Sequence, residues 1–168
     1  MMDSLTYILN TPDPDAYGKQ LYFYARKLTL TFPFYSTDRT IEQLKNGGNL
    51  RLITKQDVSN TMMDYDRDLH FLENIRLRQE DYVRNYIYWM EGVFDGQEFN
   101  EMMSDKFVFT SPAFNPHLLK KDKATLNTFI TKIHFMKAAN TFIHINLVKI
   151  RRTAKKTLDI IKQEYGVE

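Results

Sequence analysis

The chain has 168 residues, of which 43% are hydrophobic and 26% charged, and its formal net charge is +2. These values exclude an intrinsically disordered chain, which would have fewer large apolar residues and a larger net charge. The sequence contains no cysteine, which excludes disulfide bonds, thiolate nucleophiles and thiolate metal ligands. We find no internal repeat and no linker rich in Pro, Gly or Ser, so we expect a single domain, residues 1–168.

The location of the protein is predicted from what its sequence lacks. Residues 1–10 have no basic segment followed by a long apolar run, and no stretch approaches the roughly 18 apolar residues of a membrane span. The missing cysteines fit a reducing compartment. We therefore expect a cytoplasmic protein that does not contact a membrane.

The first predicted helix begins after Asp13, which can cap it, with Pro14 at the first helical position. Apolar residues then recur at helical spacing from Tyr17 to Phe32, and Pro33 ends the helix. A shorter helix is predicted from residue 37 or 38 to the glycine pair at 47–48.

Two long helices dominate the rest of the prediction. In residues 56–94 apolar side chains alternate at spacings of four and three, as in a coiled-coil seam that Arg76 and Gln79 interrupt. A second long helical region follows Asp122, either as one helix or as two that break near residues 140–141. The predicted fold class is therefore mainly α, with a small β element around residues 50–54 or 107–110 leaving α+β as the alternative.

No arrangement typical of catalysis or metal binding is found. The four histidines, at positions 70, 117, 134 and 144, are never three or four residues apart, so no two share a helix face as metal ligands. Asp64, Asp66 and Asp68 alternate as in a calcium loop, but the glycine and the later glutamate of that loop are missing. Neither a nucleophile elbow nor a phosphate-binding glycine loop is present. We expect a protein that is not an enzyme, with no catalytic residue, metal or cofactor.

Charge is separated along the chain. Residues 57–105 hold twelve acidic and four basic residues, whereas residues 106–168 hold twelve basic and four acidic ones. A row of carboxylates on a rigid helix can imitate DNA phosphates and bind a basic surface that normally receives DNA. The equally open alternative is that the two regions pair inside the protein. The predicted partner-binding residues are Asp64, Asp68, Glu73, Glu80, Asp81, Glu91, Asp95 and Glu98.

The basic end of the chain supports a second hypothesis. Cationic residues on one helix can neutralise phosphates and give salt-sensitive binding to nucleic acid. The residues concerned are Lys149, Arg151, Arg152, Lys155, Lys156 and Lys162. A regulatory protein that binds nucleic acid through this helix is the alternative function, less favoured because the neighbouring acidic segment would repel DNA.

In its length, its many Tyr, Phe, Asn and Lys residues and its lack of catalytic motifs, the chain resembles small early proteins of bacteriophages. It resembles in particular the staphylococcal phage proteins of the Twort type that inhibit the host's DNA polymerase sliding clamp. The resemblance covers the whole chain and rests on general character. It implies a protein of the host bacterial cytosol that binds the sliding clamp and keeps it from encircling DNA.

Two routes to clamp binding are open. Proteins that use the bacterial clamp carry a Gln-Leu-x-Leu-Phe motif, and residues 20–24 resemble it, with Phe23 and Tyr24 departing from the usual Leu and Phe. The possible motif residues are therefore Gln20, Leu21, Phe23 and Tyr24. The other route is occupation of the positively lined DNA channel by the acidic segment.

A homodimer would match the symmetry of the ring-shaped clamp. The aromatic residues near the interruption of the seam could join two copies, or could equally pack within one chain. The possible dimer contacts are Arg76, Gln79, Tyr82, Tyr86 and Trp89.

Overall fold

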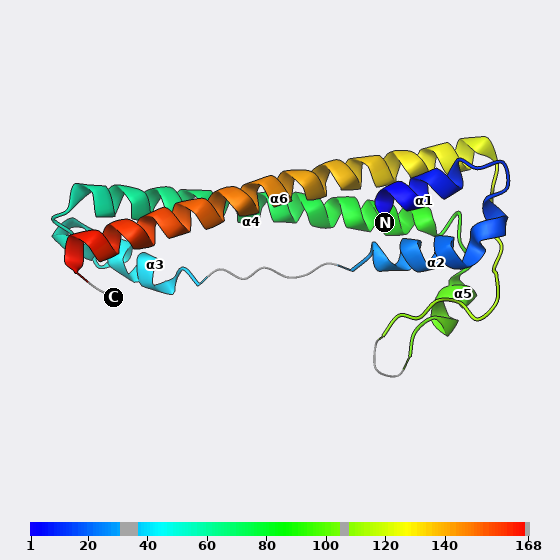
Figure 1. Ribbon diagram of the computed structural model, residues 1–168, viewed down its shortest axis with the longest axis horizontal. Coiled ribbons are helices and arrows are strands. Elements are labelled where there is room, and N and C mark those ends of the chain that lie inside the picture. Colours follow the sequence, from blue (N-terminus) through cyan, green and yellow to red (C-terminus); the bar gives the residue numbers. More distant parts are fainter. Residues whose placement is uncertain (31–36, 105–107, 167–168) are drawn as a thin grey trace. The chain divides into compact units, whose positions relative to one another are not determined.

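The computed structural model describes residues 1–30, 37–104 and 108–166, and in these residues the fold is mainly α-helical (Figure 1). This confirms the predicted fold class. The α-helices are α1 (Met2–Leu9), α2 (Gly18–Lys27), α3 (Arg39–Asn46), α4 (Gln56–Met90), α5 (Gly96–Glu101) and α6 (Lys123–Tyr165), with 3-10 turns at Pro14–Tyr17 and Asn49–Leu52. Among the helices of the described ranges, none is both long enough and apolar enough to cross a bilayer.

The contacts divide the chain into two compact units. Unit 1 is formed by residues 1–32 and 79–139, and unit 2 by residues 33–78 and 140–168. Helices α4 and α6 each contribute a segment to both units. The expected single domain stays a prediction.

Unit 1 has a large apolar core. In it α1 and α2 pack against the C-terminal segment of α4 and the N-terminal segment of α6 (Figure 1). The two long helices are antiparallel here, because Tyr82 stacks on Phe135 while Tyr86, further along α4, stacks on Phe129. The fully buried members include Leu5, Leu21, Tyr22, Ala25, Tyr86, Val93, Met102, Phe129 and Met136.

Unit 2 has a thinner core in which polar residues are as frequent as apolar ones. Its segments of α4 and α6 are also antiparallel, because Phe71 contacts Phe142 while Thr61 accepts a hydrogen bond at its backbone oxygen from the hydroxyl of Thr157. The buried apolar residues are Val58, Leu69, Leu72, Ile75 and Ile150, and the buried polar ones are Thr61, Asp66, Asp68, Asn146 and Thr157. Polar contacts therefore hold much of this unit together.

Several predicted elements differ from the structure. The predicted strand at residues 50–54 is wrong, because the backbone forms the 3-10 turn at Asn49–Leu52. At residues 107–110 the described part shows only an isolated bridge between Met103 and Phe109, and residue 107 lies outside the described residues. Asp13 makes no capping hydrogen bond, and a 3-10 turn precedes α2.

The boundaries of the long helices are better predicted. Helix α6 is continuous from Lys123 to Tyr165, which decides the open question at residues 140–141. Its start is capped as expected, because the Thr125 amide donates to Oδ1 of Asp122 over 2.9 Å. Helix α4 ends at Met90, four residues before the predicted end.

Candidate partner-binding surface

The chain just after α4 gathers carboxylates without basic neighbours. Residues 91–101 contain four acidic residues, namely Glu91, Asp95, Glu98 and Glu101, and no Lys or Arg. Asp95 begins α5, because its Oδ1 accepts the Gln97 amide proton over 2.8 Å. Glu98 and Glu101 are three residues apart in this helix and so lie on the same side of it. None of the four forms an ion pair with a basic residue that the structure describes.

An apolar hollow of about 230 Å³ lies in the same segment. It is lined by Met90, Glu91, Phe94, Gly96, Phe99 and Leu119. Phe94 is buried, whereas Leu119 is 58% exposed, so the hollow joins the core to the surface. The hollow and the four carboxylates together are called the 91–101 surface below. In the sequence, the only sign of its apolar part is that phenylalanines alternate with acidic residues in this segment.

Tyr22 of α2 fixes the position of this surface. Its ring packs edge-on against Phe94 at 4.9 Å and also contacts Phe99 at 5.1 Å. Its hydroxyl donates to the carbonyl oxygen of His117 over 2.8 Å and accepts the Asp95 amide proton over 2.8 Å. The start of α5 and the loop before α6 are therefore both tied to one buried side chain.

The pKa of the Tyr22 hydroxyl is affected by the carboxylates that surround it. Burial raises its pKa, the hydrogen bond from the Asp95 amide opposes this, and the carboxylates of Asp95 and Glu98 raise it further, to about 12. The hydroxyl therefore stays neutral at physiological pH, and the two carboxylates lie close enough to act on it.

The other predicted partner-binding residues are either paired with a basic residue or partly buried. Asp64 pairs with Arg67 over 2.8 Å, and Asp81 pairs with Arg84. Both pairs are exposed and lie within α4, where such pairs are weak. Glu73 and Glu80 are half-buried, and each takes part in an interaction within the chain.

Asp68 corrects the prediction at one position. It is only 6% exposed and lies inside unit 2, where Oδ1 accepts from the Lys149 ammonium over 2.6 Å. Its Oδ2 accepts from the Thr153 hydroxyl over 3.2 Å. Asp68 therefore pairs with the basic helix, as the alternative hypothesis held, and has no surface to offer a partner.

The clamp-motif residues lie in α2 and are largely inaccessible. Leu21 is fully buried in the core of unit 1, and Phe23 and Tyr24 are half-buried against it. Only Gln20 is exposed. A peptide that enters a pocket must present its leucine, so the folded chain corrects the prediction of Leu21 as a contact.

Of the predicted dimer contacts, one is fully buried and the others are partly exposed. Tyr86 is fully buried, with its hydroxyl donating to the Ala25 carbonyl oxygen over 3.1 Å, so it cannot contact a second copy. Tyr82 is 39% exposed, and Trp89 is half-buried with the Lys132 ammonium 5.5 Å from its ring centre. The two polar residues, Arg76 and Gln79, are half-buried.

The basic end of α6 presents a second charged surface. Lys149 is engaged by Asp68, but the other five cationic residues are exposed and lack an ion pair with any described acid. They are Arg151, Arg152, Lys155, Lys156 and Lys162, and this set is called the basic strip below. Their spacings of three, four and seven place them on neighbouring faces of one helix.

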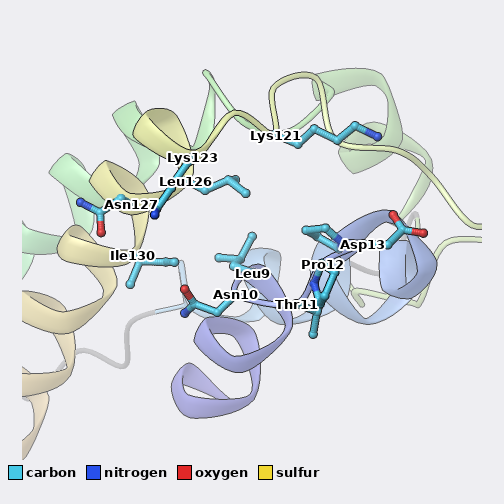
Figure 2. Close-up of a pocket in the computed structure, with 11 residues that line it drawn as sticks. Leu9, Asn10, Thr11, Pro12, Asp13, Lys121, Lys123, Leu126, Asn127 and Ile130 are labelled. Atoms are coloured by element: carbon cyan, nitrogen blue, oxygen red, sulfur yellow. The ribbon is translucent and has the colours of Figure 1, made fainter.

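A larger hollow, of about 330 Å³, lies between the end of α1 and the start of α6. Figure 2 shows Leu9 near Leu126 and Ile130, with Lys121 and Asp13 further along the same hollow. The Lys121 ammonium is engaged by Asp15 over 2.7 Å. Apolar and polar residues both line the hollow, and none of the predicted site residues is among them.

Comparisons with known proteins add nothing to these surfaces. No protein-family model, no curated protein and no solved structure matches the chain.

Proposed function

We propose that the chain is a binding protein that inhibits a bacterial replication sliding clamp, using the 91–101 surface as its main contact. The supporting observation is that four carboxylates without a described basic partner lie beside an apolar hollow. The resemblance to phage inhibitors supplies the name of the partner. Glu91 and Glu101 are exposed, and Asp95 and Glu98 are half-buried. Carboxylates that solvent can reach suit the basic lining of a channel that normally holds DNA.

The carboxylates and the apolar hollow are both needed, because neither alone would give a stable complex. Individual exposed ion pairs contribute only about 0–1 kcal/mol, so a few carboxylates speed and orient an encounter rather than hold it. The energy of a stable interface comes mainly from apolar side chains seated in hollows. A basic surface that also presents one projecting apolar side chain would use both features, with Phe94 and Phe99 receiving that side chain.

Reversing the charge of the 91–101 surface should weaken clamp binding. In the double variant Glu91→Lys/Glu98→Lys, we expect the association rate to fall about tenfold and to depend less on salt, because electrostatic steering is removed. The measurement is surface plasmon resonance with immobilised clamp at several salt concentrations. Light-scattering chromatography of the mixture with wild-type protein first establishes the complex and its stoichiometry.

The matched control reverses two exposed carboxylates elsewhere. Asp13→Lys/Asp159→Lys changes the net charge by the same amount but leaves the 91–101 surface intact, and it should bind nearly as wild type. Equal losses in both double variants would mean that only net charge matters. If no complex forms at tens of micromolar with wild-type protein, the clamp is not the partner.

The basic strip favours a second candidate function, binding of nucleic acid. Its five cationic residues are exposed, and none of them forms an ion pair with a described acidic residue. Several of the predicted acidic contacts, by contrast, are paired with basic residues. Phosphate neutralisation by such residues releases counterions and makes affinity strongly salt-dependent. This function requires no base-specific motif.

Neutralising the strip tests that candidate. In the variant Arg151→Gln/Arg152→Gln/Lys155→Gln/Lys156→Gln, the slope of log affinity against log salt should shrink by about 0.9 for each phosphate that the protein no longer neutralises. Fluorescence anisotropy with a labelled DNA duplex measures this slope. Lys120→Gln/Lys123→Gln, which removes exposed lysines outside the strip, should leave it unchanged. If the strip variant still binds the clamp, clamp binding and nucleic-acid binding use separate surfaces.

A further inference from the structure

A polar contact joins helix α3 to α4 within unit 2. None of the residues of α3 is fully buried. Its Lys45 ammonium lies 2.7 Å from Oε1 of Glu42 in the same helix and 3.0 Å from Oδ2 of Asp66 in α4. A positive charge held between two carboxylates thus links the two helices within unit 2.

A third potential ligand, His70, completes this group. Ligand atoms of Glu42, Asp66 and His70 all lie within 4.8 Å of one another. Asp66 and His70 are four residues apart and so share one face of α4, while Glu42 comes from α3. The spacing of the histidines gives no sign of this group, because its other ligands are carboxylates and one of them belongs to a separate helix.

Asp66 provides an independent observation. It is only 5% exposed, yet its Oδ1 has no hydrogen-bond donor among the described residues. Nδ1 of His70 lies 3.6 Å from this oxygen, beyond hydrogen-bond distance. A buried carboxylate oxygen without a donor is energetically costly and calls for a positively charged or donating group.

A contact with the backbone of α4 holds the imidazole of His70 in place beside Asp66. Its Nδ1 lies 2.9 Å from the backbone oxygen of Asp66. A ring that donates from Nδ1 to a carbonyl keeps the lone pair of Nε2 for a metal, and such a hydrogen bond is the usual support of a ligating histidine. His70 is half-exposed, so a metal ion can reach it from solvent.

We propose that Glu42, Asp66 and His70 bind a divalent transition-metal ion of the Zn²⁺ class. Two carboxylates and one imidazole suit Zn²⁺, Co²⁺ or Ni²⁺ better than Mg²⁺ or Ca²⁺, which prefer oxygen ligands alone. The Lys45 ammonium occupies the cationic position between the carboxylates and competes with the metal. Metal binding displaces it and joins α3 to α4 through direct coordination.

The test is isothermal titration calorimetry of the full chain with Zn²⁺, and Mg²⁺ is the comparison ion. We expect one Zn²⁺ per chain and no measurable Mg²⁺ binding at the same concentrations. His70→Ala should weaken Zn²⁺ binding at least about tenfold. His134→Ala removes an exposed histidine in unit 1 and should bind as wild type.

A second variant tests the competition directly. Lys45→Met removes the ammonium while keeping the length of the side chain, and should tighten Zn²⁺ binding about fivefold or more. Circular dichroism checks that each variant keeps its helix content. The proposal is overturned if His70→Ala and His134→Ala bind alike, or if Lys45→Met binds no tighter than wild type.

Discussion

Replacing Gly18 with alanine should lower the free energy of unfolding by about 3 kcal/mol, near the upper end for overpacked positions. An added Cβ would lie 1.9 Å from the carbonyl oxygen of Pro116, far inside van der Waals contact. The neighbouring backbone cannot move freely, because the Lys19 amide donates to Oδ1 of Asn115 over 3.1 Å and the Lys19 ammonium donates to the Ala113 carbonyl oxygen over 2.6 Å. Urea unfolding followed by circular dichroism measures the loss.

Gly96→Ala is the matched control for this variant. Gly96 also begins a helix of unit 1, but an added Cβ would meet nothing within 4 Å. Alanine favours a helix over glycine by up to about 1 kcal/mol, so this variant should be as stable as wild type or slightly more so. Similar losses in the two variants would show that α2 and the loop at residues 113–116 are not in the close contact described.

The helical fold was predictable because it depends on local patterns. Apolar spacing identified the long helices, and Gly47 ends α3 at the expected place. Helix α1 was not predicted, because eight residues give too short a pattern to recognise. At residues 50–54 the alternation of apolar and polar residues indicated a strand. The segment has no neighbouring strand in the described residues, and a 3-10 turn forms at Asn49–Leu52.

The candidate surface was predictable only in part, because burial depends on contacts between distant residues. Asp64 and Asp68 look alike in the sequence, yet one is exposed and the other is buried beside Lys149, 81 positions away. The loss of Asp68 as a partner contact follows from the antiparallel packing of α4 and α6 within unit 2. In residues 91–101 the sequence itself is informative, since no basic residue lies within the segment.

The same reasoning explains why the buried charge at Asp15 was missed. Asp15 lies in the 3-10 turn before α2 and is only 7% exposed, although nothing in its sequence neighbourhood distinguishes it from Asp13. Its partners come from about a hundred residues away. Its Oδ1 accepts the Leu118 amide proton over 2.9 Å, and its Oδ2 accepts from the Lys121 ammonium over 2.7 Å.

Asp15→Asn should therefore destabilise the protein by about 2 kcal/mol at pH 7, the range for hydrogen bonds to charged groups. The asparagine oxygen can still accept from the Leu118 amide, but its NH₂ group would face the Lys121 ammonium with no lone pair to offer. Asp13→Asn, at an exposed position without a capping hydrogen bond, should leave stability unchanged. Equal effects in these two variants would contradict the buried contact.

The stability that Asp15 contributes should depend on pH, whereas a loss caused by poor packing should not. Burial by itself raises the pKa of Asp15, but the Leu118 amide, the Lys121 ammonium and His117 together hold that pKa below its ordinary value of 3.8. A carboxylate whose pKa is lower in the folded than in the unfolded state adds stability above pH 3.8, and this stability is lost as pH falls through the folded pKa. The difference in unfolding free energy between wild type and Asp15→Asn should therefore be larger at pH 5 than at pH 3, because it shrinks below about pH 4. A difference that persists unchanged at pH 3 would assign the loss to packing, and the ion pair with Lys121 would carry none of it.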